Sequence, residues 1–253
     1  MECSLIVLGS GTSVPTPDRR PPAFLLKADA LSLLVDCGAG CTTGLAAAGV
    51  TLETLSAVLI SHLHLDHTGG VPALLFTLRN PLGPRREDDL VFYGPAGFSM
   101  MLDGLDGVYG KWLTPLHCAR RCKAVSDRET FEIGPARIEA FRVAHTGSSF
   151  AYRVQLGERA ICFSGDSGPC EGLTAAAAGV DLFVCECGAA EDDDFKGHMS
   201  ASDVGETAAE AGCKAVLLTH LYPHIVVTDP VSVVKERYSG TVTLAEDGMR
   251  IEV

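Results

Sequence analysis

Three histidines and an aspartate fall within six positions of the sequence, directly after an apolar run. The stretch is SHLHLDHTGG (61–70), and it follows LSAVLI (55–60). Imidazole and carboxylate groups are ligands of zinc in proteins, and polar side chains gather where strands end. This density predicts a metal site rather than a solvated surface. The candidate ligands are His62, His64, Asp66 and His67.

The spacing of these ligands predicts an extended loop. Leu63 and Leu65 alternate with the first two histidines, so an extended segment would turn both imidazoles one way and both leucines toward the core. Two histidines on one helix would bind one metal at a separation of four residues, which is not the pattern here. Gly69-Gly70 then allows a tight turn before an apolar helix.

Three further candidate ligands follow apolar runs later in the chain. His145 ends IEAFRVAH, Asp166 follows AICFS, and His220 follows AVLLT. Taken singly, either histidine could be a core residue with satisfied polar atoms, and the aspartate could be a turn or cap residue. Together with the first cluster they complete a ligand set for two metal ions.

The elements that must position these ligands are short apolar strands alternating with helices, which predicts the α/β class. A loop-rich stretch at 107–130 contains no long polar linker, so we expect a single domain over 1–253. Strands are expected at 4–8, 23–27, 31–36, 56–60, 90–93, 137–144, 150–155, 160–164, 182–186, 215–219, 241–244 and 249–253. Helices are expected at 42–48, 71–78, 98–105, 173–178, 201–211 and 231–238.

The charge of the chain argues against a long polyanionic partner. Binding to a nucleic-acid backbone rests on many Lys and Arg contacts, whereas the formal net charge is −12. The basic runs are short pairs, and an acidic run at 191–194 would repel a polyanion. Each of these runs is most simply a solvated surface. The basic pairs lie at 19–20, 85–86 and 120–121.

The start of the chain and its cysteines indicate the compartment. No basic leader precedes the first apolar run, which stops at Gly9, and no segment is long enough to span a membrane. The ten cysteines are then expected to stay reduced, mostly as small buried residues, in a cytoplasmic protein. No membrane partner is expected.

The order of the motifs resembles that of the metallo-β-lactamase superfamily, in which HLHLDH is followed by a histidine, by GD and by LTH. Within the superfamily, the chain looks most like the ribonuclease Z branch. Similar to that branch are LGSGTSVPTPDRRPPAFLL, LLVDCGAG and HMSASDVGETAAEAGCKAVLLTH. The resemblance implies a four-layer αββα sandwich of two similar halves that meet near 107–130, with both metal ions in the groove between the sheet edges.

The opening GSGTSV (9–14) also begins like a dinucleotide-binding loop. It lacks the third glycine of that motif, and Pro15 and Pro17 prevent the helix that should follow. The resemblance to the first loop of the superfamily explains it better.

The resemblance also implies a metal-dependent hydrolase with two zinc ions, although manganese or iron would suit these ligands too. Two zinc ions would share a hydroxide as the nucleophile. The first zinc would take three histidines, the second an aspartate and two histidines, and a further aspartate would bridge them. These sets are His62, His64 and His145; Asp66, His67 and His220; and Asp166.

Three residues would act in catalysis by the same resemblance. Asp66 would orient the hydroxide or take its proton, besides serving as a ligand. His198 is similar to the ribonuclease Z histidine that contacts the phosphate and assists the leaving group. Glu186 is similar to the acidic partner of that histidine, although CECGAA around it departs from the branch pattern. The structural alternative is a helix-cap neighbourhood for His198 and a surface carboxylate for Glu186.

The length of one segment limits the substrate. Many ribonuclease Z chains carry an arm between the motif histidine and the bridging aspartate that grips the tRNA body. Here twenty residues (146–165) separate His145 from Asp166, room for two strands and a turn. With the charge of −12, this disfavours tRNA and favours a small phosphodiester, such as a cyclic nucleotide or an oligonucleotide end.

Two other functions stay open on the sequence. The same metal centre could serve a zinc acyl hydrolase acting on a lactone or thioester, without a role for His198. The metals could also serve stability alone, if no coordination position were open. Members of this branch are often dimers, and the apolar content of the chain permits a homodimer interface.

Overall fold

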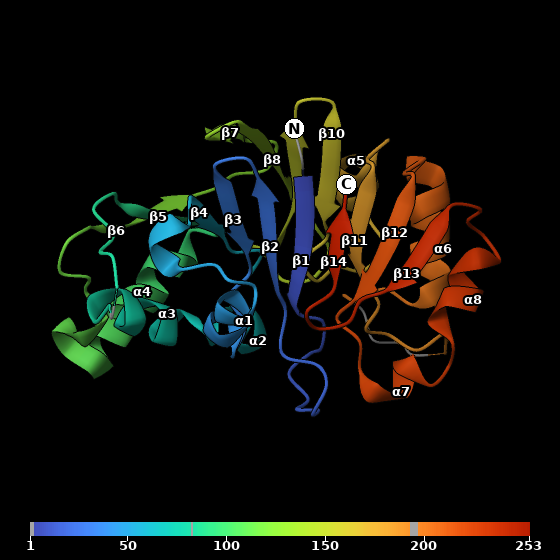
Figure 1. Cartoon of the computed structure of the whole chain (residues 1–253). Coiled ribbons are helices and arrows are strands. Elements are labelled where there is room, and N and C mark those ends of the chain that lie inside the picture. The colour runs from blue at the N-terminus through green and yellow to red at the C-terminus, as the bar shows by residue number, and fades with distance from the viewer. Residues whose placement is uncertain (1–2, 82, 193–196) are drawn as a thin grey trace.

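Two seven-stranded sheets lie at the centre of the molecule (Figure 1). The computed structural model describes residues 3–81, 83–192 and 197–253. In spatial order, the first sheet contains β14 (Arg250–Glu252), β1 (Cys3–Gly9), β2 (Ala23–Ala28), β3 (Leu31–Val35), β4 (Ala57–Leu59), β5 (Leu90–Gly94) and β6 (Arg120–Ala124). The second contains β13 (Thr241–Leu244), β12 (Ala215–Thr219), β11 (Leu182–Glu186), β10 (Arg159–Phe163), β9 (Phe150–Leu156), β8 (Ala136–Arg142) and β7 (Thr130–Ile133).

Each sheet combines antiparallel and parallel pairs. The strands β3 to β6 run parallel to one another, as do β10 to β13. The carboxyl ends of parallel strands meet at one edge of a sheet, where ligands bind in such folds. β14, the last strand of the chain, pairs with β1, the first, so the two ends of the described chain lie close together (Figure 1).

The core explains why the strands are apolar on both faces. Leu5 and Val7 of β1 lie in the core between the two sheets, whereas Ile6 and Leu8 lie in the core under the helices. All seven residues of β1 are buried. A strand covered on both faces is a continuous apolar run rather than an alternating one, as the sequence shows here.

Helices cover the outer face of each sheet, which gives the four layers. On the first sheet these are α1 (Cys41–Ala47), α3 (Val71–Arg79) and α4 (Gly97–Tyr109), and on the second α5 (Glu171–Ala177), α6 (Ala201–Ala211) and α8 (Pro230–Lys235). Shorter elements are α2 (Leu65–Thr68), α7 (Pro223–Val226) and the 3-10 turns Leu52–Thr54 and Gly110–Leu113. The expected α/β class and αββα sandwich are confirmed.

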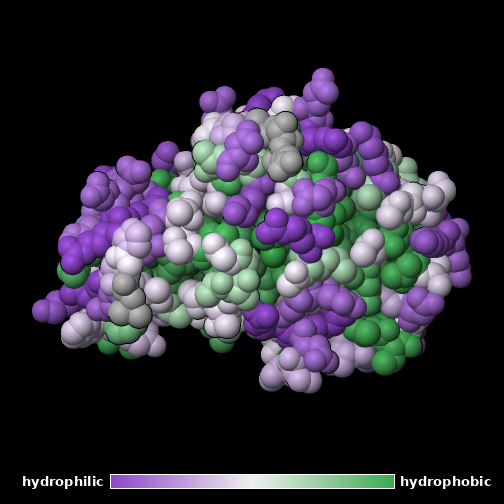
Figure 2. All heavy atoms as spheres, viewed as in Figure 1, coloured by the Kyte–Doolittle hydropathy of each residue, from purple (hydrophilic) through white to green (hydrophobic). Residues whose placement is uncertain are grey.

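The surface in this view mixes polar and apolar side chains (Figure 2). Hydrophilic residues dominate its upper edge and its left end, while apolar ones gather across the middle of the face.

Among the described residues, no helix has the length and apolar character needed to cross a membrane.

All the strands and helices expected from the sequence are present, with ends shifted by a few residues. The stretch 107–130, expected to be loop-rich, also contains regular elements, because α4 extends to Tyr109, a 3-10 turn follows, and β6 lies within it. β7, which begins at Thr130, was not expected either. Both strands lie at sheet edges. β6 exposes most of its side chains and has no apolar pattern, while β7 is only four residues long and contributes two apolar residues, Phe131 and Ile133, to the core.

Several arginines of the basic pairs make hydrogen bonds and ion pairs within the fold, which a solvated surface would not require. Arg86 is buried, with 8% of its surface exposed, and donates hydrogen bonds to the carbonyls of Leu55 and Asp89. Arg120 pairs with Asp106 and Arg121 pairs with Asp89. The expectation of a solvated surface is therefore wrong for Arg86. In the acidic run, 193 and 194 lie outside the described residues.

The ten cysteines are all free thiols, and seven of them are buried. They pack as small apolar residues, mainly in the cores beneath the helices. The expectation that the cysteines are mostly buried is confirmed, and their reduced state stays a prediction.

One buried hydrogen bond joins the two sheets beside the candidate ligands. The Tyr152 hydroxyl on β9 donates to the carbonyl of Ile60, just after β4, at 2.8 Å. The next carbonyl, that of Ser61, accepts from the amide of Phe150 at 3.0 Å. The segment that enters the histidine cluster is thus attached to the second sheet.

We expect Tyr152→Phe to lower the free energy of unfolding by about 1–3 kcal/mol, because the buried Ile60 carbonyl would lose its donor. Urea denaturation measures this change. Tyr109→Phe, at an exposed tyrosine, is the matched control and should leave the stability unchanged. Equal stability of Tyr152→Phe and the wild type would show that the bond contributes nothing.

Candidate metal centre

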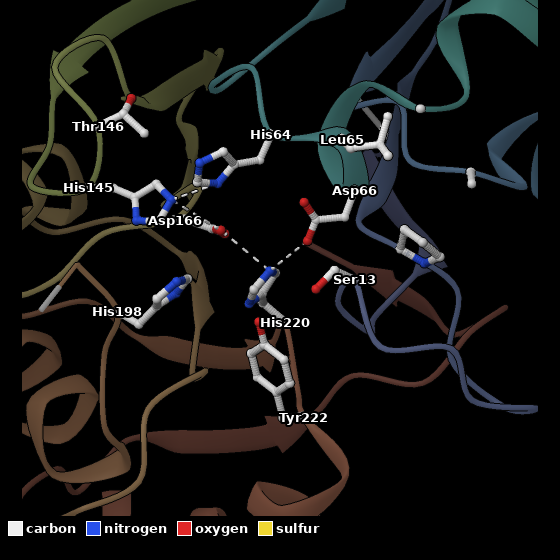
Figure 3. Close-up of a pocket in the computed structure, with 13 residues that line it drawn as sticks. Ser13, His64, Leu65, Asp66, His145, Thr146, Asp166, His198, His220 and Tyr222 are labelled. Atoms are coloured by element: carbon white, nitrogen blue, oxygen red, sulfur yellow. Dashed lines mark hydrogen bonds and ion pairs between the residues drawn. The ribbon is translucent and has the colours of Figure 1, made fainter. Parts of the chain in front are cut away.

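Seven candidate ligands converge at the carboxyl ends of strands from both sheets. Figure 3 shows the five of them that line a cavity, which are His64, Asp66, His145, Asp166 and His220. The segment after β4 supplies the first cluster, and the loops after β8, β10 and β12 supply His145, Asp166 and His220. The ligand atoms form two main groups, within each of which all atoms lie within 4.8 Å of one another. The first group is His62, His64, His145 and Asp166, and the second is Asp66, His67 and His220.

The Asp166 carboxylate lies between the two groups. Its Oδ2 is 3.6 Å from His62 Nε2, 3.7 Å from His145 Nε2 and 3.4 Å from His220 Nε2. Its Oδ1 is 3.1 Å from His67 Nε2. Neighbouring imidazoles hold the pKa of Asp166 well below its usual range, although burial alone would raise it. The carboxylate is therefore an ionised group in contact with both groups.

Several buried polar atoms of the cluster have no hydrogen-bond partner among the described residues. They include His62 Nε2, His67 Nε2 and Asp166 Oδ1. An unpaired buried donor or acceptor is costly, and such atoms in a native fold indicate an unseen partner. Because all three face the centre of the cluster, metal ions are the partner that fits. Divalent metal binding is the expectation that this donor set supports.

The far nitrogens of the histidines are held so that the near ones can bind a metal. His145 Nδ1 donates to the carbonyl of Gly197 at 2.8 Å. Ser61 Oγ gives its proton to Asp36 and accepts from His62 Nδ1, 3.0 Å away. Burial and the charges of neighbouring histidines, His67 first, lower the pKa of His62 to about 2. A neutral imidazole is the form that ligates a metal.

Asp36, which the sequence analysis did not single out, contacts the candidate ligand His67 and is a further candidate site residue. It lies at the end of β3, 2% exposed, and its Oδ2 accepts a 2.7 Å hydrogen bond from His67 Nδ1. Oδ1 accepts from the amide of Ser61 at 2.8 Å. A carboxylate behind a ligating histidine fixes its tautomer and orientation. The available signal was an acidic residue at a strand end in VDCGAG, the same placement as Asp166.

The expectation that Leu65 points into the core is wrong. His64 is extended, but α2 begins at Leu65, so the alternation of an extended segment ends there. Leu65 is 79% exposed and lines the cavity at the cluster. Leu63, in contrast, packs against the core under the helices as expected.

His198 and Glu186 lie together at the side of the cluster. His198 Nδ1 donates to Glu186 Oε1 at 2.8 Å, and Glu186 also accepts from the amides of Ser167 and Gly188, at 3.0 and 2.9 Å. Glu186 is 1% exposed, so it is not a surface carboxylate. Burial lowers the pKa of His198, but the bond and charge of Glu186 outweigh burial and raise it. The N-cap of α6 is Ser200, two residues after His198, and not His198 itself.

The cluster opens into a cavity of about 740 Å³. Besides the candidate ligands and His198, its wall is formed by neutral residues, among them Leu65, Thr146 and Tyr222 (Figure 3). No lysine or arginine lines it among the described residues. The cavity therefore presents imidazoles and carboxylates at its floor and uncharged groups at its wall.

Residues 32–221 match a family model described as the beta-lactamase superfamily domain. The chain belongs to the beta-lactamase superfamily. The match spans the candidate ligands from His62 to His220 and most of both sheets.

Proteins with similar sequences or structures cover nearly the whole chain. A ribonuclease Z of Agathobacter rectalis is 27% identical over 88% of this chain and 89% of its own length. An uncharacterised protein of Mycobacterium tuberculosis is 32% identical over 94% of this chain and 88% of its own. The metallo-beta-lactamase fold protein YhfI of Bacillus subtilis superposes with a TM-score of 0.87 at 25% identity, over 100% of both chains. The expected resemblance to the ribonuclease Z branch is confirmed.

We expect Asp36→Asn to weaken metal binding by about 10- to 100-fold, the usual effect of removing a carboxylate behind a metal-ligating histidine. Asparagine tolerates the positive φ of 57° at this position, so the backbone should be retained. Titration of metal-free protein with Zn²⁺ against a chromogenic chelator gives the affinity. Asp181→Asn, at a carboxylate that binds Ala160 and Lys214 instead, is the control. Unchanged zinc affinity in Asp36→Asn would contradict this role.

Proposed function

We propose that the chain is a metal-dependent phosphodiesterase that holds two zinc ions and hydrolyses a small phosphodiester, such as a cyclic nucleotide or an oligonucleotide end. The observation that carries this proposal is the His198–Glu186 pair beside the metal-ligand cluster. Ligand atoms of Asp166, His198 and His220 lie within 4.8 Å of one another. A proton donor at this place serves a phosphate ester, whose leaving oxygen must be protonated. The relative named ribonuclease Z supports the same class of substrate.

In this proposal the two groups of ligands each hold one ion. His62, His64 and His145 would bind the first, and Asp66, His67 and His220 the second, with Asp166 shared. Two zinc ions held there would lower the pKa of water and neutralise charge on the phosphoryl oxygens.

Asp66 would orient the attacking water. Its side chain is 11% exposed and lines the cavity, and its Oδ2 lies 3.4 Å from His220 Nε2. Burial raises the pKa of Asp66, but the bond from His220 and the charges of nearby histidines outweigh it and bring the pKa to about 2. The carboxylate thus stays ionised and accepts a hydrogen bond, so it can align a water molecule.

His198 would protonate the leaving oxygen. Because Glu186 accepts from Nδ1, that nitrogen keeps its proton, and the raised pKa of His198 favours a second proton on Nε2. The ring lines the cavity, where Nε2 can give this proton to the departing alkoxide (Figure 3). Glu186 would stabilise the protonated ring of His198 and hold its orientation.

The size and charge of the site support a small substrate over tRNA. Residues 146–165 contain β9, β10 and short turns, with no arm. At least one arginine of each basic pair makes contacts within the fold: Arg20 with Asp247, Arg86 with the Leu55 carbonyl, and Arg120 and Arg121 with aspartates. The neutral wall of the cavity suits a nucleoside or another uncharged group next to one phosphate. A long polyanion would find few cations here.

The first experiment compares hydrolysis rates of several substrates by zinc- and manganese-loaded protein. The panel is bis(p-nitrophenyl) phosphate, cyclic adenosine monophosphate, a tRNA with a 3′ extension, a thioester and a lactone. We expect turnover of the small phosphodiesters, a much lower rate on tRNA, and no activity in Asp66→Ala. Turnover of the thioester or lactone alone would overturn the proposal and favour an acyl hydrolase.

We expect the effect of His198→Ala to depend on the leaving group. The kcat on cyclic adenosine monophosphate should fall by about 10²–10⁴-fold, the usual contribution of general acid catalysis. The kcat on bis(p-nitrophenyl) phosphate should fall much less, because p-nitrophenolate leaves without a proton. Glu186→Gln should show the same pattern more weakly. Equal losses on both substrates would argue that His198 has another role.

A further inference from the structure

A single carboxylate closes the loop that joins β1 to β2. Asp247 lies in the turn between β13 and β14, and its Oδ1 accepts from the amide and the hydroxyl of Ser10, both at 2.9 Å. Its Oδ2 accepts from the amide of Arg20 at 2.8 Å and lies 3.1 Å from Arg20 Nε. The side chain is 8% exposed. Asp247 therefore binds both ends of the loop at once.

The base of this loop is too narrow for side chains. A Cβ added at Gly9 would lie 1.9 Å from the carbonyl oxygen of Pro21, and one added at Gly11 would lie 2.9 Å from Arg19 Cβ. The Gly11 amide also donates to the carbonyl of Arg20 at 2.8 Å. The glycines of GSGTSV thus serve close approach of two backbone segments, and not a phosphate.

The closed loop forms part of the cavity wall. Ser13 lies in the loop and Pro21 just past its base, and both line the cavity. Ser13 and Tyr222 both line the cavity, and Tyr222 comes from the segment after β12 in the second sheet (Figure 3). The amide of Leu221 donates to the carbonyl of Ser10 at 3.2 Å, so the loop and this segment are joined.

Ser13 and Tyr222 have the position and chemistry to contact the organic group of a substrate. Tyr222 follows the candidate ligand His220 and packs edge-on against its ring, with centroids 5.8 Å apart. Its aromatic face and the Ser13 hydroxyl offer stacking and a hydrogen bond beside the metal-ligand cluster. The tyrosine is half-buried and Ser13 is exposed, so both remain accessible.

We propose that Asp247 is a positioning residue for the reaction, because it closes the loop 10–20 and so holds Ser13 against Tyr222 as a wall for the substrate's organic group. The proposal rests on the proposed function only in that the cavity is the active site. It predicts that Asp247 affects substrate binding rather than the chemical step or the metals.

Amide hydrogen exchange tests the closure of the loop without any substrate. In Asp247→Asn, the amides of Ser10, Gly11 and Arg20 should exchange faster, since the charge that pairs with Arg20 and one acceptor are lost. Zinc content should equal that of the wild type. Asp181→Asn is the matched control. It alters a carboxylate just before β11, at the end of that strand away from Glu186, and should leave the exchange of these three amides unchanged. Unchanged exchange in Asp247→Asn would overturn the proposal.

Steady-state kinetics with bis(p-nitrophenyl) phosphate test the consequence. We expect KM to rise by about ten-fold in Asp247→Asn, the size of the loss of one hydrogen bond to a charged group, with a much smaller change in kcat. Ser13→Ala and Tyr222→Leu, which removes the aromatic face, should raise KM as well. In the double variant Asp247→Asn/Tyr222→Leu, KM should rise less than the product of the single effects. A fall in kcat at constant KM, or effects that multiply fully, would overturn the proposal.

Two further outcomes are decided by the same variants. If Asp247→Asn does not fold, Ser13→Ala and Tyr222→Leu carry the test, and unchanged KM in both would overturn the proposal. If the wild type does not hydrolyse phosphodiesters, the proposed function fails. KM is then compared on the thioester or lactone that the wild type hydrolyses, where the same rise in Asp247→Asn supports the positioning role and unchanged KM overturns it.

Discussion

The structure depends on one buried charge. Asp166 is 2% exposed, yet four imidazoles from three separate segments lie within 3.7 Å of its carboxylate. A buried charge is tolerated only when it is compensated, so these groups must converge. The two sheets meet this requirement by bringing strand ends from both halves of the chain to the same edge. The Tyr152–Ile60 bond between the sheets, at the entry to the histidine cluster, supports the same arrangement.

Around this charge, a second set of groups fixes the orientation of the rings. Asp36 holds His67, the Gly197 carbonyl holds His145, and Glu186 holds His198. Two residues here adopt left-handed backbone conformations, Asp36 with φ 57° and His220 with φ 54°. Such conformations are costly for residues other than glycine and tend to occur at functional sites. Asp36 directly follows β3 and His220 directly follows β12, and the side chain of each lies in the cluster.

The candidate metal ligands and the cavity wall support different parts of the proposed function, the reaction class and the substrate respectively. The ligand set supports a hydrolase and is compatible with phosphodiester or acyl substrates. The His198–Glu186 pair, the neutral wall and the loop closed by Asp247 lie outside that set. They favour a small phosphodiester because they offer a proton for a leaving oxygen and a surface for an uncharged group. Selectivity in this chain is thus proposed to reside in segments that the ligand motifs do not contain.

The sequence by itself determined the strands with apolar runs, the fold class and the candidate ligands, because these signals are local. His62, His64, Asp66 and His67 lie within six residues, and the other ligands each end an apolar run. Tertiary structure alone decided the contacts between distant segments: Asp36 with His67, and Asp247 with Ser10 across 237 positions. It also decided the edge strands β6 and β7 and the outward turn of Leu65. The edge strand β6 exposes most of its side chains and β7 is only four residues long, so neither leaves a long apolar run. A single carboxylate acquires its role only from the partner that folding brings to it.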